Sequence, residues 1–197
     1  LVFVNKIDKL GANFYKTVDA IRERLGVKPA VMVLPIGVEN SFKGVYDLLK
    51  EEAYIWGGDE LGAKFEVSKN IPPELDPADV AKYRNLLIEQ IAETDETLLE
   101  KYLGGEIPSY EELHASLRKA VISYQLVPIF TGTSLRNKGV QPLLDAIIDY
   151  LPSPLDKPAI EGTHPQTKEI VGRKADNNAP FTGLMFKVQL DPHVGKL

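Results

Sequence analysis

An apolar run and a polar loop stand next to each other in the sequence Leu1-Val2-Phe3-Val4-Asn5-Lys6-Ile7-Asp8. The four apolar residues, two of them β-branched, predict a short strand buried on both faces, as the strands of parallel sheets are. The polar residues follow the carboxyl end of this strand, which is where open α/β sheets bind ligands. These eight residues therefore indicate both an α/β fold and the place of a ligand site.

The next residues complete a strand–helix–strand unit. Apolar side chains between Phe14 and Leu25 recur at spacings of four, three and four, as in an amphipathic helix, and Gly26 suits its C-terminal cap. A second buried strand is predicted over Ala30 to Leu34. The order strand, helix, strand is one unit of a parallel α/β sheet.

The sequence pattern changes at Pro35, where frequent glycines predict short strands and turns. Asp76-Pro77 is a helix start signal, an N-cap followed by proline at the first helical position. This helical pattern weakens near Thr94-Asp95 and stops at Gly104. A second helix is expected after Ser109, which forms a capping-box pattern with the glutamate three residues later.

The last part of the chain contains a strand, a helix and a boundary. Leu126 to Phe130 predicts a strand, and a helix over residues 140–151 follows a polar loop. The apolar face expected for this helix consists of Val140, Leu144, Ile147, Ile148 and Leu151. Pro152-Ser153-Pro154 is expected to mark a domain boundary. The alternation over Leu184 to Leu190 predicts the first strand of a β domain.

Composition excludes several classes of protein. The 197 residues include no cysteine, so disulfides, thiolate metal sites and cysteine nucleophiles are ruled out. The net charge of −5 argues against binding of nucleic acid such as DNA through the whole surface, and no apolar run approaches the roughly 20 residues of a membrane span. Residues 51–113 carry sixteen acidic and five basic side chains, which indicates a solvated acidic face or a docking surface for a basic partner.

The polar loop Asn5-Lys6-Ile7-Asp8 suits recognition of guanine. A carboxylate can accept from the adjacent N1–H and 2-amino donors of that base in a charge-assisted pair, and adenine offers no such pair. The lysine stem can lie along the base plane, while the asparagine can brace the loop and touch the base edge.

A second polar loop, Gly132-Thr133-Ser134-Leu135, follows the predicted strand 126–130. Its small polar residues are expected to leave backbone N–H groups for a carbonyl such as guanine O6. Together the two loops predict a guanine pocket made by Asn5, Lys6, Ile7, Asp8, Thr133, Ser134 and Leu135.

With these two loops, the sequence resembles the translational GTPases, and among them the elongation factor G family. The resemblance begins with Asn5 to Asp8 as the base-specificity motif and spans essentially all 197 residues. The other matching runs are Gly11–Phe14, Leu34–Gly37, Phe42–Leu48, Asn137–Ala146, Asp149–Pro154 and Asp191–Gly195. The chain departs from the family at Thr133-Ser134-Leu135-Arg136, where Ser-Ala-x-Lys is usual, and an arginine fork is not equivalent to a lysine point charge.

The resemblance implies a fold in three parts. Residues 1–25 and 126–154 would be the C-terminal part of a GTP-binding G domain, with a partial P-loop-GTPase-type parallel sheet. Residues 26–125 would be the inserted α+β subdomain called G′. Residues 155–197 would be a linker and the first strand of a β-barrel domain II. Because the first residue is Leu1 rather than Met, we expect a piece of a longer protein.

The resemblance also implies a function. The intact protein would hydrolyse GTP on the ribosome, with GTP or GDP and Mg²⁺ as cofactors, and drive translocation of tRNA and mRNA. Its setting would be the cytoplasm or an organellar matrix, and the G′ region would contact the ribosomal stalk protein. The phosphate-binding loop, the switch segments and the catalytic histidine would precede Leu1. We therefore expect no catalytic residue, no metal ligand, no tightly bound nucleotide and no GTP hydrolysis in this chain alone.

Two alternatives remain open from the sequence. One is a related GTPase, such as a ribosome-recycling paralogue, a tetracycline-resistance-type protection factor or release factor 3. The other is a non-enzymatic module in which the acidic segment 51–113 docks a basic ribosomal partner and the nucleotide motifs are inert.

Overall fold

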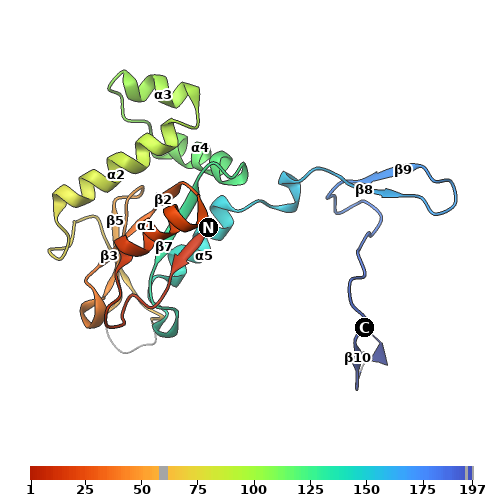
Figure 1. The fold of residues 1–197 in the computed structure, drawn as a ribbon, viewed down its shortest axis with the longest axis horizontal. Helices are drawn as coiled ribbons and strands as arrows, with labels where there is room; N and C mark the ends of the chain where they lie inside the picture. Colours follow the sequence, from red (N-terminus) through yellow and green to blue (C-terminus); the bar gives the residue numbers. More distant parts are fainter. Residues whose placement is uncertain (58–61, 194, 197) are drawn as a thin grey trace. The chain divides into compact units, whose positions relative to one another are not determined.

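The computed structural model describes residues 1–57, 62–193 and 195–196. The chain forms two compact units, Leu1–Leu151 and Pro152–Leu197. The first unit is a mixed α/β structure, and Figure 1 shows its helices and strands in sequence order from red to cyan. No helix over the described residues is long and apolar enough to cross a membrane.

A three-stranded parallel sheet forms one half of the first unit. Its strands are β1 (Val2–Val4), β2 (Pro29–Val31) and β7 (Val127–Thr131), in the order β1-β7-β2. Val2 pairs with Ile129, and Val31 pairs with the same residue from the other side. The predicted parallel sheet is confirmed, but the strand from the far end of the unit lies between the first two strands.

Helix α1 (Phe14–Leu25) connects β1 to β2 and crosses in front of the parallel strands in Figure 1. The Asn13 side chain accepts a hydrogen bond from the Lys16 backbone N–H at 3.0 Å, and the Gly26 N–H donates to the Arg22 carbonyl at 3.1 Å. Phe14 and Val18 are buried. The expected helix and its cap at Gly26 are therefore confirmed.

The predicted strand Ala30–Leu34 is in fact two strands that belong to different sheets. β2 ends at Val31, and β3 (Val33–Ile36) begins a separate antiparallel sheet. At the crossing point, the Met32 N–H donates to the Ile129 carbonyl at 3.0 Å, while its own carbonyl accepts from the Leu48 N–H at 2.9 Å. Every residue from 29 to 36 is buried, so hydrophobicity gave no sign of the change of sheet.

The antiparallel sheet has the order β3-β4-β5-β6, with β4 (Gly44–Asp47), β5 (Glu52–Ile55) and β6 (Glu66–Ser68). A short 3₁₀ helix, η1 (Glu39–Ser41), connects β3 to β4. Buried side chains of both sheets and of the helices belong to one continuous hydrophobic cluster. The segment 26–125 thus shares its core with the parallel sheet, and it includes residues 58–61, which lie outside the described residues.

Three helices complete this segment: α2 (Pro77–Ala92), α3 (Glu96–Leu103) and α4 (Tyr110–Ile122). The predicted break near Thr94-Asp95 separates α2 from α3, because Asp95 caps α3 by accepting from the N–H groups of Thr97 and Leu98. Its other carboxylate oxygen accepts from the Ser116 hydroxyl of α4 at 2.9 Å.

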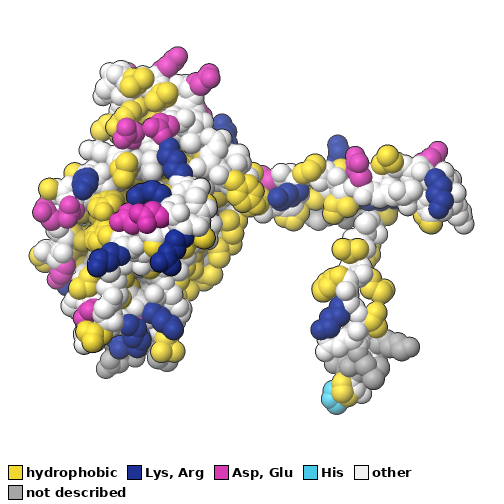
Figure 2. Space-filling view, viewed as in Figure 1, with side chains coloured by type: hydrophobic (Ala, Val, Ile, Leu, Met, Phe, Trp, Pro, Cys, Tyr) yellow, Lys and Arg dark blue, Asp and Glu magenta, His cyan; other side chains and the backbone are white. Residues whose placement is uncertain are grey.

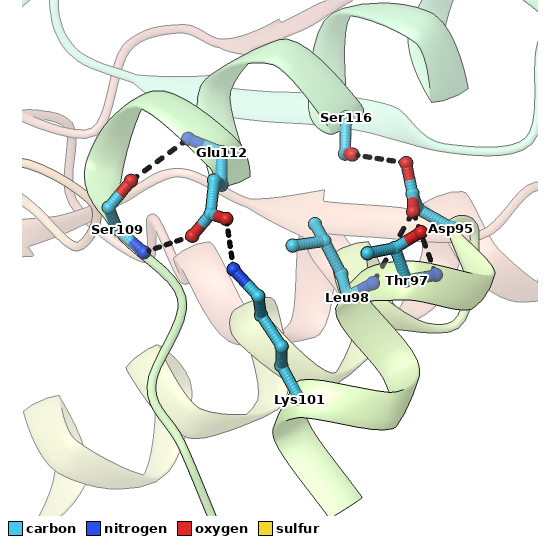
Figure 3. A network of polar contacts seen from close by, with 7 residues as sticks. All are labelled: Asp95, Thr97, Leu98, Lys101, Ser109, Glu112 and Ser116. Atoms are coloured by element: carbon cyan, nitrogen blue, oxygen red, sulfur yellow. Dashed lines mark hydrogen bonds and ion pairs between the residues drawn. The ribbon is translucent and has the colours of Figure 1, made fainter.

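A second polar contact joins α3 to α4. Ser109 and Glu112 form the predicted capping box, and the Glu112 carboxylate also pairs with Lys101 of α3. Figure 3 shows this pair and the Asp95 contacts, which lie at two separate points between α3 and α4. The short helix α3 is thus tied to α4 by side chains at its beginning and near its end.

Helix α5 (Val140–Tyr150) follows the 3₁₀ turn η2 (Ser134–Arg136). Its buried residues are Pro142, Ala146 and Tyr150, and Tyr150 packs against His114 of α4. The predicted inward face is wrong, since Leu144, Ile147 and Ile148 are exposed, Ile148 at 78%. Pro142, Ala146 and Tyr150 recur every four residues and form the buried face of the helix. The prediction chose the neighbouring face because its side chains are more apolar.

The second unit contains little buried surface. It includes η3 (Pro154–Asp156), a hairpin of β8 (Ile160–Thr163) with β9 (Ile170–Arg173), and the short pair β10 (Leu190–Asp191) with β11 (Gly195–Lys196). The strand predicted over Leu184–Leu190 is wrong for residues 184–189, which have no regular structure. Their apolar side chains are exposed, and in the described part of the chain no strand pairs with them.

Candidate functional site

The two polar loops meet at one edge of the parallel sheet. Residues 5–8 follow β1, residues 132–135 follow β7, and these strands are parallel neighbours. The Gly132 N–H donates to the Val4 carbonyl at 3.2 Å, and the Ile7 N–H donates to the Gly132 carbonyl at 3.3 Å. A side chain at Gly132 would meet the Lys138 carbonyl at 2.3 Å, so this close approach requires glycine.

Asn5 fastens the two loops together. Its Oδ1 accepts from the Lys6 N–H at 2.8 Å and from the Ser134 N–H at 3.0 Å. Its Nδ2 donates to the Ser134 hydroxyl at 2.9 Å. All three polar contacts of the amide are made to protein groups, so Asn5 braces the loops in this structure.

The backbone N–H groups of the second loop are arranged differently from the sequence prediction. Ser134 N–H, expected to serve a base carbonyl, donates to Asn5, and Thr133 N–H donates to the Lys138 carbonyl at 2.9 Å. Within the described residues, nothing accepts from the N–H of Leu135, whose side chain is exposed. Within this loop, Leu135 therefore has the backbone N–H group that is available to a ligand.

Asp8 carries an incompletely paired carboxylate. The residue is only 6% exposed, and its Oδ1 is buried with no hydrogen-bond partner among the described residues. Oδ2 lies 3.5 Å from Nε of Arg136 and 3.9 Å from Nζ of Lys9. Leaving a buried carboxylate oxygen unpaired is costly, and such an atom in a native structure calls for a partner, such as a ligand, an ion or a water.

The remaining predicted residues line or support the same place. Lys6 is exposed and has a positive φ of 62°, an uncommon backbone conformation outside glycine. Ile7 and Thr133 are almost completely buried and anchor their loops from below. A hollow of about 280 Å³ lies beside the first loop and is lined by residues 4–7 and 9–13 and by Thr17. Its described lining includes neither Asp8 nor a residue of the second loop. Figure 2 shows Lys and Arg side chains gathered at the end of the first unit where these loops lie in Figure 1.

Three residues that contact the loops were not assigned a role from the sequence. Arg136 approaches Asp8, Glu39 contacts Ile7 and Gly11, and Gly62 accepts from Asn137. Arg136 stands where the family pattern has lysine, which was the one available signal. Glu39 and Gly62 come from the inserted segment, and no local pattern connects them to residues 5–8 or 132–138.

The described residues offer no metal site. No group of three His, Asp or Glu side chains among them could hold a metal ion.

A nucleotide-binding α/β domain is the class of protein that this fold and this loop arrangement define. The sequence profile described as "Elongation factor Tu GTP binding domain" matches residues 1–153. The chain belongs to this family, which consists of translational GTPases that bind GTP and GDP with Mg²⁺.

One solved structure is similar to the chain over its whole length. The chain is similar to a crystal structure of a protein from Thermus thermophilus, with a TM-score of 0.73 and 30% sequence identity. The similarity covers 100% of this chain and 26% of the Thermus chain. The chain thus spans about a quarter of the length of that protein.

Proposed function

We propose that these residues are part of a ribosome-dependent translational GTPase of the elongation factor G type, which couples GTP hydrolysis to tRNA–mRNA translocation. The part played by this chain is recognition of the guanine base. The observation that carries the proposal is the buried Asp8 carboxylate, whose Oδ1 has no hydrogen-bond partner among the described residues where the two loops meet. Membership in the GTPase family and the run Asn137–Ala146 support it.

Asp8 would select guanine by accepting two adjacent donors. Oδ1 takes one of the N1–H and 2-amino groups, and Oδ2, which Arg136 approaches only to 3.5 Å, takes the other. The Leu135 N–H is available for guanine O6, and Ser134 would join it only by releasing Asn5. The Lys6 stem would cover the base plane.

Phosphate chemistry is not assigned to this chain. Phosphoryl transfer needs a phosphate cradle, Mg²⁺ and a positioned water. The sequence contains no Gly-x-x-x-x-Gly-Lys-Ser/Thr loop, and the described residues offer no cluster that fits a metal ion. We expect the 197 residues alone to hold GTP weakly and to hydrolyse none of it.

Replacement of Asp8 by asparagine tests the proposal in the full-length protein that contains this chain. The amide can donate to the carbonyl that xanthine has in place of the 2-amino group. The preference for GDP over xanthosine diphosphate should therefore fall on the order of a hundredfold. Competition binding measures the ratio, with Asp19→Asn on the exposed side of α1 as the matched control. An unchanged ratio would remove Asp8 from base recognition.

A docking role of the inserted segment is a second proposal, and it can coexist with the first. Residues 51–113 hold most of the acidic excess, and Figure 2 shows Asp and Glu side chains over α3. Such a surface suits a basic ribosomal partner, for which we propose the stalk protein, in the cytoplasm or an organellar matrix.

Charge reversal on α3 tests this docking. Glu96→Lys combined with Glu100→Lys should weaken stalk-protein binding several-fold at low salt and have less effect at high salt. Asp145→Lys on α5 is the control, because it makes the same kind of charge change outside residues 51–113. Binding that ignores the reversal on α3 would contradict the proposed surface.

A further inference from the structure

Residues of the inserted segment hold both base-recognition loops from outside the parallel sheet. We infer that Glu39 and Gly62 are positioning residues for guanine recognition, each fixing one of the two loops. The inference rests on the proposed function, since it concerns the same site. Neither residue lies in a recognition loop. Glu39 contacts the first loop directly, whereas Gly62 acts on the second loop through Asn137, which follows it in the chain.

Glu39 holds the loop that carries Asp8. Its N–H donates to the Ile7 carbonyl at 3.1 Å, and its Oε1 accepts from the Gly11 N–H at 2.7 Å. These two bonds enclose residues 7–11, so Asp8 lies between the two points of attachment. Glu39 makes them from a positive φ of 50°, which a non-glycine residue adopts only where the surroundings impose it.

Gly62 holds the second loop. Its carbonyl accepts from Nδ2 of Asn137 at 3.3 Å, from Nε2 of Gln141 at 2.9 Å and from Nε1 of Trp56 at 3.1 Å. Asn137 closes the turn η2, because its N–H donates to the Ser134 carbonyl at 3.1 Å. Gly62 is thus connected to the residues that carry the Ser134 and Leu135 N–H groups.

The fit at Gly62 leaves no room for a side chain. A Cβ there would lie 2.4 Å from the Arg136 carbonyl and 2.6 Å from the Asn137 carbonyl, and the φ of +69° is unfavourable for other residues. Trp56, which donates to the same carbonyl, is buried against Phe65 in the core of the inserted segment. The contact therefore connects the buried core of that segment to the turn after β7.

Together these contacts form a clamp across the site. Glu39 and Gly62 fix one loop each, and Asn5 joins the loops to each other. Base recognition requires the Asp8 carboxylate and the second-loop N–H groups to keep their spacing, because misplaced donors and acceptors lose most of their contribution. Loosening either contact should weaken guanine nucleotides without creating a preference for xanthine.

The test measures GDP affinity and the ratio of GDP to xanthosine diphosphate affinity in the full-length protein. Glu39→Ala should weaken GDP roughly five- to tenfold, about one lost hydrogen bond, and Glu39→Gln should restore it because its amide oxygen still accepts from Gly11. Gly62→Ala should weaken GDP at least about tenfold, because the added Cβ conflicts with the Arg136 and Asn137 carbonyls and displaces the Gly62 carbonyl from its donors. The xanthine ratio should stay as in the wild type.

Matched controls separate positioning from general damage. Gly57→Ala places a methyl group where no atom of the described residues, other than its chain neighbours, lies within 4 Å, and Glu89→Ala removes an exposed carboxylate from α2. Both controls should bind GDP as the wild type does. Gln141→Ala is the second variant to use if Gly62→Ala lowers the melting temperature. It removes one donor to the Gly62 carbonyl and should still weaken GDP binding several-fold.

The outcomes distinguish this inference from the proposed function. If Asp8→Asn changes base preference while Glu39→Ala, Gly62→Ala and Gln141→Ala bind GDP like their controls, the clamp is overturned and the base site stands. If Asp8→Asn leaves the preference unchanged, the proposed function is overturned first. Failure of Glu39→Gln to restore affinity would also contradict the role given to the Gly11 contact.

Discussion

At the scale of single residues, Asp8 places a carboxylate in a buried position, and one of its oxygens has no hydrogen-bond partner in the described part of the chain. An uncompensated polar atom of this kind reduces stability by roughly 1–3 kcal/mol. Arg136 offsets little of this cost, because it contacts the other oxygen at 3.5 Å and is itself half exposed. The protein therefore retains a group that is unfavourable until a ligand supplies donors, as is common at functional sites.

Asp47 provides a prediction about pH. Burial raises the pKa of this carboxyl to about 6, although the N–H groups of Leu49 and Lys50 donate to it and lower the pKa. Since the folded pKa lies above the unfolded value of 3.8, the native state binds more protons between these values. Stability from this group is present below about pH 4 and is lost as the pH rises through about 6.

Asp47→Asn removes this titration. Between pH 4 and pH 7 the wild type should lose roughly 2–3 kcal/mol of unfolding free energy relative to the variant, following from about two pKa units. Urea unfolding of both proteins across this range gives the difference directly. Parallel stability curves would show that Asp47 titrates as an ordinary exposed carboxyl.

The base-site residues illustrate how far sequence alone reaches at this scale. Residues Asn5 to Asp8 and Thr133 to Leu135 could be nominated because each group follows a predicted strand, and the structure brings the two groups together. Which N–H is available could not be foreseen, because that depends on the Asn5 side chain crossing to Ser134. Glu39 and Gly62 left no local signal, since their partners are distant in sequence.

At the scale of elements, the short helix α3 depends on Asp95. This carboxylate caps the helix and also accepts from Ser116 of α4. Asp95→Ala should destabilise the protein by about 1–3 kcal/mol through loss of the cap and of the contact between helices. Chemical denaturation measures this loss, with Asp145→Ala on the exposed side of α5 as the control.

Asp95 also predicts how the stability of the protein changes at acidic pH. The hydrogen bond from Ser116, together with the backbone donors of the cap, holds the pKa of Asp95 below its ordinary value of 3.8. Its stabilisation is therefore present above that value and is lost as the pH falls through the lower folded pKa. Asp95→Asn should keep most of the cap but flatten this part of the curve. Equal acid sensitivity of the two proteins would contradict the assignment.

Elements with local start and stop signals were the ones predictable from sequence. Asp76, Ser109 and Gly26 act at short range, and the helices that they bound are confirmed. The division of residues 29–36 between two sheets depends on which distant strands pair with each half. The buried side of α5 likewise depends on contacts with α4, so apolarity alone gave the wrong face.

At the scale of the whole molecule, the hydrophobic core lies within the first unit. Among the described residues, none of the buried cluster comes from the chain after Tyr150, and most side chains of the second unit are exposed. A chain of residues 1–151 should therefore unfold cooperatively with a melting temperature within a few degrees of that of the full 197 residues. Calorimetry on both chains checks this, and a large loss would show that the second unit stabilises the first.

The order of the strands in the parallel sheet could not be predicted from the sequence. A strand–helix–strand unit predicts two parallel strands but not whether a third strand lies between them. That position is filled by β7, which follows the whole inserted segment. Because β1 and β7 are neighbours, the loops that follow them lie at the same edge of the sheet.

The central position of β7 has a consequence for biosynthesis. Among the described strands, β1 and β2 pair in this sheet only with β7, so neither has its partner until residues 127–131 have been made. Such pairings give the domain a high contact order, which slows folding. Nascent chains that end before this strand contain two apolar strand segments that have no partner in the sheet. Such chains are candidates for chaperone binding. The two loops of the proposed base pocket therefore come together only after residues 127–131 have been made, when this one strand joins the sheet.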